Sequence, residues 1–156
     1  MQPATSRVKA LTRFTAIVAA VTQTAEPVGV YWLEAGATHP PELIVQMARD
    51  TALSQRAMVW SGVRLIAGPG PKRSLLSLGM KQMQLPDLLL LAPQSAKPDA
   101  SVDALYGLLG MLLERGKPMG EGDVVGRTPT ESLPVHYVSS PANAETKVWR
   151  VELPER

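Results

Sequence analysis

The chain contains no cysteine among its 156 residues. This absence excludes thiol nucleophiles, thiolate metal ligands, disulfide bonds and thiol-based redox switching within the chain. A chain without cysteine fits a cytosolic protein, because disulfides are rare in that reducing compartment. We therefore predict a cytoplasmic protein.

Residues suited to acid-base or metal chemistry are also scarce, because the chain has only two histidines, His39 and His136. Zinc sites usually show closely spaced pairs of ligands, and no such pair is present. No serine lies in a G-x-S-x-G motif, since the segment LLSLG lacks the first glycine. The sequence therefore predicts no catalytic residues, no metal ligands and no cofactor.

Two glycine-containing segments lack the features of a phosphate-binding loop. In GPGPKR, at residues 68–73, the prolines remove N–H donors that such a loop presents. In GEGDVVGR, at residues 120–127, no helix follows, and Glu121 and Asp123 would repel a phosphate. The 16 basic and 14 acidic residues are spread along the chain without a block of like charge, so nucleic-acid binding is not predicted.

Long hydrophobic runs are absent as well, and none approaches the ~20 apolar residues that span a bilayer. We therefore predict no membrane association. At the N-terminus, Arg7, Lys9 and Arg13 precede an apolar run over residues 14–21, an outline similar to a secretory signal. The helical spacing of the apolar residues favours an amphipathic helix whose apolar face packs into the core. That face comprises Val8, Leu11, Phe14, Ile17, Val18 and Val21.

What is present is the composition of a globular domain, with 45% hydrophobic and 19% charged residues. A chain of this length matches one ordinary domain and buries roughly two thirds of its unfolded surface. The 14 prolines and 12 glycines indicate many short connections. We predict a single α+β domain over residues 1–156, with a mainly antiparallel sheet packed against about three helices.

Periodicity and turn residues predict the elements of this domain. Besides the N-terminal helix, one helix opens at Thr38 to Glu42 and fades near Leu53, and another, capped by Asp99 or Ser101, ends at Arg115 and Gly116. The predicted strands cover residues 28–32, 58–67, 74–80, 87–91, 123–126, 133–139 and 147–153. The apolar run 87–91 suits a central strand covered on both faces.

Three tryptophans, Trp32, Trp60 and Trp149, each fall on a predicted strand. Strand aromatics usually pack inward, so a core position is the expectation for each one. A tryptophan exposed beside Arg64 or Arg150 would instead favour a binding surface, because exposed Trp and Arg commonly anchor interfaces. These five residues are our candidates for partner binding.

A series of short motifs occurs in a characteristic order: VYW, THPPE, SLGMKQMQLPD, LLERG, GDVVGRT, LPVHYVSSP and VWRVELP. In this order the chain resembles a bacterial family, domain of unknown function 4261, over about residues 28–154. The resemblance implies an α+β module from bacteria whose genomes encode contact-dependent toxins and secretion systems. It implies no catalytic residues, since none are established for that family.

Two hypotheses for function remain. The first is a non-enzymatic interaction protein, such as a cytoplasmic immunity protein that neutralises a bacterial toxin or an accessory factor of a secretion system, for example type VI secretion. It predicts an exposed patch with aromatic and arginine anchors. The second is a small enzyme or ligand-binding domain that combines His39, His136, Asp123 and Glu34 in a concave pocket. We favour the first, because the sequence lacks an evident catalytic constellation.

Overall fold

The computed structural model describes residues 4–67, 70–128 and 130–155. Within these ranges the helices are α1 (Ala4–Ala25), α2 (Pro41–Arg49), α3 (Leu53–Trp60), α4 (Pro98–Arg115) and the 3-10 turn η1 (Met80–Met83). The strands are β1 (Val30–Trp32), β2 (Ala37–His39), β3 (Gly62–Ile66), β4 (Lys72–Leu78), β5 (Leu88–Pro93), β6 (Val124–Val125), β7 (Leu133–Pro134), β8 (His136–Ser139) and β9 (Lys147–Glu152). The predicted α+β class is confirmed.

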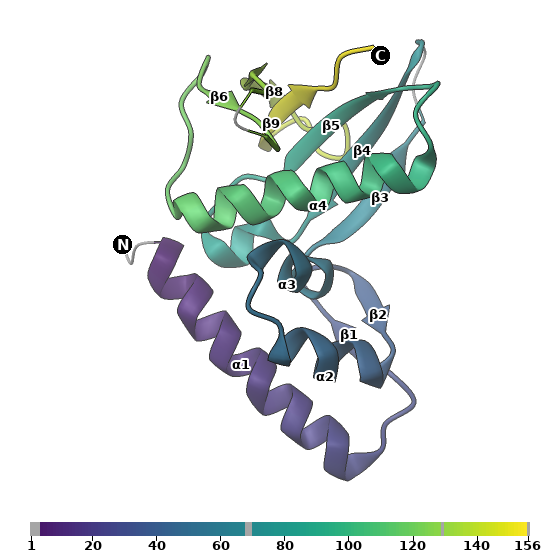
Figure 1. Ribbon diagram of the computed structural model, residues 1–156, viewed down its shortest axis with the longest axis vertical. Helices are drawn as coiled ribbons and strands as arrows, with labels where there is room; N and C mark the ends of the chain where they lie inside the picture. The colour runs from purple at the N-terminus through teal and green to yellow at the C-terminus, as the bar shows by residue number, and fades with distance from the viewer. Residues whose placement is uncertain (1–3, 68–69, 129, 156) are drawn as a thin grey trace.

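A five-stranded sheet with the order β3-β4-β5-β9-β8 forms the upper half of the molecule (Figure 1). Every neighbouring pair is antiparallel except β5 and β9, which run parallel. The apolar strand β5 is central, as its continuous hydrophobic run predicted. Two further hairpins, β1–β2 and β6–β7, lie outside this sheet.

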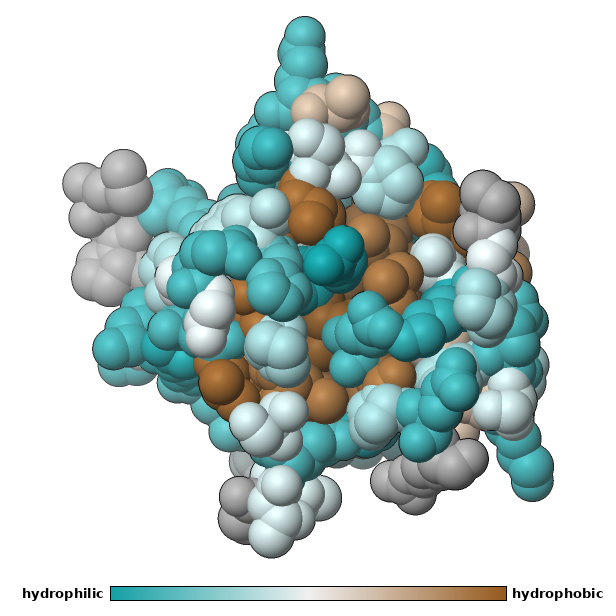
Figure 2. Space-filling model, turned by 90° about the horizontal axis from the view of Figure 1, so that it is seen from above, coloured by the Kyte–Doolittle hydropathy of each residue, from teal (hydrophilic) through white to brown (hydrophobic). Residues whose placement is uncertain are grey.

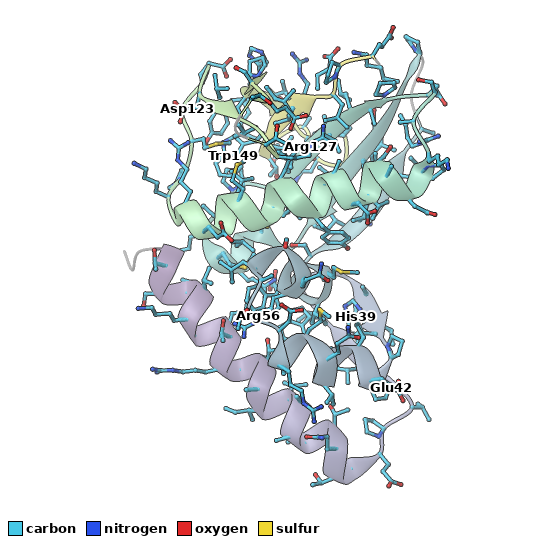
Figure 3. The ribbon with its side chains drawn as sticks, in the orientation of Figure 1. His39, Glu42, Arg56, Asp123, Arg127 and Trp149 are labelled. Atoms are coloured by element: carbon cyan, nitrogen blue, oxygen red, sulfur yellow. The ribbon has the colours of Figure 1, made fainter. Side chains whose placement is uncertain are left out.

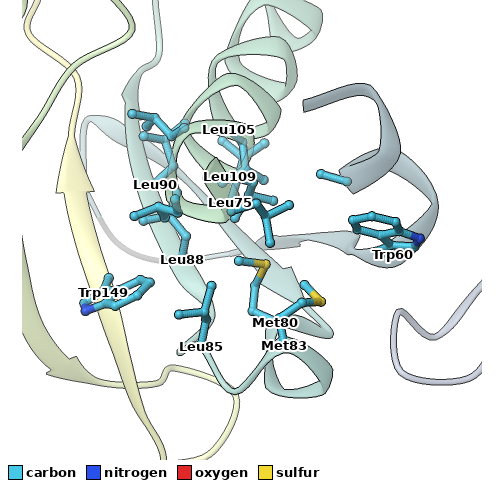
Figure 4. Packing of buried hydrophobic residues seen from close by; sticks show 14 of the residues in the cluster. Trp60, Leu75, Met80, Met83, Leu85, Leu88, Leu90, Leu105, Leu109 and Trp149 are labelled. Carbon is cyan, nitrogen blue, oxygen red and sulfur yellow. The ribbon is translucent and has the colours of Figure 1, made fainter. Parts of the chain in front are cut away.

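Helix α4 covers one face of the sheet and buries a leucine stripe against it (Figures 1 and 4). Leu105 and Leu109 from the helix join the strand residues Leu75, Leu88 and Leu90 in one core cluster. Each fully buried leucine contributes about 1.5–3 kcal/mol through removal of apolar surface from water. The helix therefore packs against one face of the sheet, and no helix of the described residues covers the other face.

The two ends of α4 differ in how well they were predicted. Gly116 has a φ of 64° and donates its N–H to the carbonyl of Leu112, which confirms the predicted glycine exit. Capping by Asp99 or Ser101 was wrong, because the helix begins at Pro98 and Lys97 is the capping position. Proline favours this start because its ring fixes φ and it has no N–H to satisfy.

The lower half of the molecule contains α1, α2, α3 and the β1–β2 hairpin (Figure 1). The α1 residues that are buried are Val8, Thr15, Ala19 and Thr22. Phe14, Ile17 and Val21 were predicted to pack into the core, but they are more than half exposed. The inner face accepts threonine because the hydroxyls of Thr15 and Thr22 donate to helix carbonyls four residues earlier, at 2.8 and 2.7 Å.

Three other predicted elements differ in the structure. The predicted strand 58–67 was wrong in its first part, because residues up to Trp60 belong to α3 and the strand begins at Gly62. The second helix ends at Arg49 instead of Leu53, since the Asp50 carboxylate accepts the N–H of Ala52 at 2.8 Å and stabilises a turn there. The segment 28–32 was predicted to be a buried strand, but only residues 30–32 form a strand and Tyr31 is 61% exposed.

The predicted hairpin between β3 and β4 is confirmed by their antiparallel register. Residues 68 and 69 of its predicted turn lie outside the described residues. The segment 133–139 forms two short strands, β7 and β8, which are separated at Val135. None of the helices that the structure describes is both long and apolar enough to cross a bilayer.

Candidate interaction surfaces

The three tryptophans proposed as partner-binding residues are buried, with exposed fractions of 6% for Trp32 and 0% for Trp60 and Trp149. The indole N–H of Trp32 donates to the Gln82 side chain at 3.1 Å, and that of Trp60 donates to Thr15 Oγ1 at 2.8 Å. The low exposed fractions confirm the core position expected for each tryptophan. None of the three offers an exposed anchor, so a binding surface has to be built from other residues.

Arg64 and Arg150, the other two candidates, lie on the same face of the sheet, opposite to α4. Strand register places five side chains in one row across the sheet. The row runs through Arg64 in β3, Leu76 in β4, Leu89 in β5, Arg150 in β9 and His136 in β8. Because neighbouring strands are ~4.8 Å apart, the two arginines are separated by about 14 Å across the strands. The structure thus brings together residues that are 86 positions apart in sequence.

The centre of this open face is apolar. Leu76, Leu89 and Val148 form a second hydrophobic cluster, separate from the core beneath α4. Half-buried side chains pack around it, namely Ile66, Leu78, Leu91 and Val138. Seen from above, hydrophobic residues lie at the centre of the surface and hydrophilic residues surround them (Figure 2). Leu76, Leu89 and Val148 are themselves only 1%, 8% and 1% exposed, so the apolar contact area of this face comes from the half-buried side chains around them. An apolar area inside a polar rim is the usual anatomy of an interface.

Charged side chains border the apolar centre. Lys72 pairs with Glu152, and His136 Nδ1 lies 2.7 Å from Glu121 Oε1. The backbone N–H of Tyr137, and then His136, lower the pKa of Glu121, so this carboxylate stays ionised. Arg64 is exposed and Arg150 is partly exposed.

A groove of about 550 Å³ lies beside β9 on this face. It is lined by basic and acidic side chains together with the connection into β7: Lys72, Thr130, Glu131, Ser132, Leu133, Pro134, His136, Arg150, Glu152, Leu153 and Pro154. The guanidinium of Arg150 carries donors in a planar fork that suits a carboxylate. The groove can therefore accept an acidic side chain next to the apolar centre.

The alternative site, built from His39, His136, Asp123 and Glu34, is not assembled. His39 lies among the elements of the lower half, whereas Asp123 lies at the far upper end of the molecule (Figure 3). Asp123 pairs with Arg115 at 2.9 Å, and His136 pairs with Glu121. Within residues 4–67, 70–128 and 130–155, no group of three or more His, Asp or Glu side chains is placed to hold a metal ion.

His39 has a structural role, because it is buried and bonded to the backbone of another element. The residue is 8% exposed, and Nε2 donates to the carbonyl of Val59 at 3.2 Å. Burial lowers the pKa of His39 below its ordinary value of 6.5, and the bond to Val59 offsets part of that effect. The neutral imidazole therefore links β2 to α3 through its bond to Val59.

A second surface was missed by sequence reasoning. Large hydrophobic side chains are exposed together on the outer face of α1 and on the adjoining β1 hairpin, namely Phe14, Ile17, Val21, Val28, Tyr31 and Leu33. The Phe14 ring contacts the edge of Trp32 at a centroid distance of 5.7 Å, which links the helix to the hairpin. Hydropathy gave no signal of this surface, because it places Phe14, Ile17 and Val21 inside, whereas the structure buries Thr15 and Thr22.

Comparison of the chain with protein-family models, curated proteins and solved structures gives no significant match. The resemblance to the domain of unknown function 4261 family stays a prediction from the sequence motifs.

Proposed function

We propose that the chain is a non-enzymatic interaction module that binds a protein partner on the open face of the five-stranded sheet. The observation that carries this proposal is the row of Arg64, Leu76, Leu89, Arg150 and His136 across all five strands. The half-buried apolar side chains of this face, Ile66, Leu78, Leu91 and Val138, supply contact area, and the arginines at both sides of the row supply orientation.

The side chains of this face indicate what kind of surface the protein partner presents. Three basic side chains, Arg64, Lys72 and Arg150, and the imidazole of His136 border the apolar centre, against the carboxylates of Glu121 and Glu152. The complementary surface carries aliphatic or aromatic residues at its centre and carboxylates at its edge. A nucleic acid is a poorer fit, because the chain carries a net charge of only +2 and the row is interrupted by leucines.

The resemblance to a bacterial family suggests the biological setting of such binding. We propose a cytoplasmic immunity protein that neutralises a toxin, or an accessory factor of a secretion system. Either role requires a protein surface and no catalytic group.

Affinity capture of the tagged chain from its own bacterium, followed by mass spectrometry, identifies the partner. The test compares wild type with Arg64→Glu/Arg150→Glu and with Arg49→Glu/Lys81→Glu, a double variant of equal charge change at exposed residues away from this face. We expect one stoichiometric partner that is retained by wild type and by the control. Its dissociation constant, measured by calorimetry, rises about tenfold or more in Arg64→Glu/Arg150→Glu.

If the partner is a toxin, co-expression of wild type restores growth and the Arg64→Glu/Arg150→Glu variant fails to do so. Equal binding by the two double variants would exclude the open sheet face as the partner site. The absence of any stoichiometric partner would contradict the interaction module as a whole.

A further inference from the structure

The two edges of the five-stranded sheet differ in what lies beside them. Strands β3 and β8 are the edge strands in the order β3-β4-β5-β9-β8. In an edge strand, alternate residues turn their N–H and C=O groups away from the sheet, and this row of unpaired groups is a template for a further strand. An edge that is not covered can therefore bind a strand from another chain.

The edge at β8 is covered. Gly122 donates its backbone N–H to the Val135 carbonyl at 2.9 Å, and Val135 donates to the Asp123 carbonyl at 2.8 Å, so the segment before β6 lies along the chain between β7 and β8. Within β8, the backbone N–H of Tyr137 donates to the Glu121 carboxylate at 2.5 Å. The edge N–H of Tyr137 therefore already has a partner and is not available to an added strand.

The edge at β3 is open over residues 63–66. Among the described residues, the backbone of this segment bonds to no strand or loop except β4. Only the start of β3 is covered, because a Cβ at Gly62 would lie 2.2 Å from the carbonyl oxygen of Ala35. Natural edges are usually blunted by proline, by an inward-pointing charge or by a covering element. Residues 63–66 contain no proline, and Leu65 is 65% exposed, so β3 keeps the properties of a strand-binding edge.

The side chains of β3 determine which strand fits beside it. Leu65 lies opposite Leu75 of the core cluster and so faces the α4 side, whereas Arg64 faces the open side of the sheet. None of the ion pairs among the described residues includes Arg64. Because cross-strand neighbours on one face interact, the fitting strand carries an apolar residue beside Leu65 and a carboxylate beside Arg64. A second copy of β3 is a poorer fit, since Gly62–Ile66 has no acidic residue to offer Arg64.

We infer that the protein partner adds a strand to β3 at residues 63–66, with an apolar side chain beside Leu65 and a carboxylate beside Arg64. This inference rests on the proposed function, because Arg64 belongs both to this edge and to the row on the open face. Since β3 ends that row, a partner on the open face reaches the edge directly. Backbone bonds to β3 then supply affinity, and the two side chains supply specificity.

Hydrogen exchange of the full chain, resolved by residue with NMR, tests this binding mode. In the free chain, alternate amides of residues 63–66 point away from β4 and exchange rapidly. In the complex with the captured partner, we expect these amides to exchange about tenfold or more slowly, because each donates to the added strand. A partner that contacts only the open face makes no bonds to these amides, so they continue to exchange rapidly.

Leu65→Lys tests the side-chain contact on the α4 side of the edge. We expect the dissociation constant of the partner to rise about threefold or more, because the apolar cross-strand contact is lost. The added charge has the sign that favours an acidic partner, so a weaker complex reports the lost contact and not repulsion. Val124→Lys is the matched control, because Val124 is 52% exposed on β6 and receives the same substitution. It leaves the dissociation constant unchanged.

The outcomes separate strand addition from the proposed function. Rapid exchange of all outward β3 amides in a complex that Arg64→Glu/Arg150→Glu weakens would overturn strand addition and leave the open face as the partner site. Equal affinity of wild type and Leu65→Lys would overturn it too. Slow exchange in the free chain that becomes rapid on dilution would place a second copy at this edge instead of the partner. The absence of a stoichiometric partner would overturn the proposed function and strand addition together.

Discussion

Among single residues, His39 shows how burial converts a potentially catalytic group into a structural one. Its ring is buried between β2 and α3 and donates to Val59. Desolvation lowers its pKa, so the folded protein keeps the imidazole neutral where the unfolded chain binds a proton. His136, the other histidine, lies on the sheet surface beside Glu121.

The lowered pKa of His39 predicts that acid destabilises the fold. Below pH 6.5, the ordinary pKa, the unfolded chain takes up a proton that the folded chain excludes, so stability is lost as the pH falls toward the lowered pKa. Urea unfolding at about pH 7.5 and 5.5 measures this loss. We expect a smaller loss in His39→Gln, whose amide keeps a donor for the Val59 carbonyl. His136→Gln serves as the control, and an equal loss in wild type and His39→Gln would refute the assignment.

Thr15 and Thr22 explain why the face of α1 was assigned wrongly from sequence. Hydropathy ranks Phe14, Ile17 and Val21 above threonine, so periodicity places them inside. In the structure the threonine hydroxyls are satisfied by the carbonyls of their own helix, and Thr15 also accepts the indole N–H of Trp60. The helix therefore buries its threonines at little cost, and hydropathy alone does not reveal this.

Among the elements, the contact between α3 and α4 depends on close backbone approach. A Cβ at Gly110 in α4 would lie 2.7 Å from the backbone N and Cα of Ser54 in α3. At Gly107, one turn earlier on the same helix, the nearest atom would be Arg127 Cγ at 4.0 Å. Two glycines of equal helix propensity thus have different roles, because only one of them meets the backbone of another helix.

Alanine substitutions at these two glycines separate packing from propensity. Gly110→Ala forces α3 and α4 apart and costs about 1–3 kcal/mol of unfolding free energy, despite the better helix propensity of alanine. Gly107→Ala gains stability, by about 0.5–1 kcal/mol, because alanine loses less backbone entropy than glycine. Chemical denaturation of both variants measures the contrast, and the prediction fails if Gly110→Ala is as stable as Gly107→Ala.

The boundary between α3 and β3 shows that the local sequence pattern does not decide between helix and strand. Residues 58–67 alternate well enough for a strand, yet the chain is helical up to Trp60. Trp60 donates to Thr15, and Ser61 follows in extended conformation with its N–H bonded to Ala57. Contacts to α1 and α4 decide the helix, because short apolar segments suit either structure until they pack.

At the scale of the whole molecule, one core joins the lower and upper halves. Trp60 from α3 and Trp149 from β9 belong to the same buried cluster, together with the leucines of α4 (Figure 4). Elements from both halves share side chains in that cluster, so opening one half exposes apolar surface of the other. The physical expectation is one cooperative unit.

We therefore predict a single unfolding transition. In the variant that retains Trp60 as the only tryptophan, fluorescence reports the lower half, and in the variant that retains Trp149 it reports the upper half. In each variant the fluorescence midpoint in urea coincides with the midpoint from far-UV circular dichroism of the same variant. Separate midpoints within one variant would show that the halves unfold independently.

The sequence by itself determined the α+β class, the central apolar strand, the α4 helix with its glycine exit and the β3–β4 hairpin. These features depend on local periodicity, turn residues and capping, which are properties of neighbouring residues. The tertiary structure decided which faces stay open: the row from Arg64 to Arg150 and the outer face of α1 that carries Phe14, Ile17 and Val21. An open face depends on how distant segments pack, and the periodicity of one segment does not record whether a neighbour covers it.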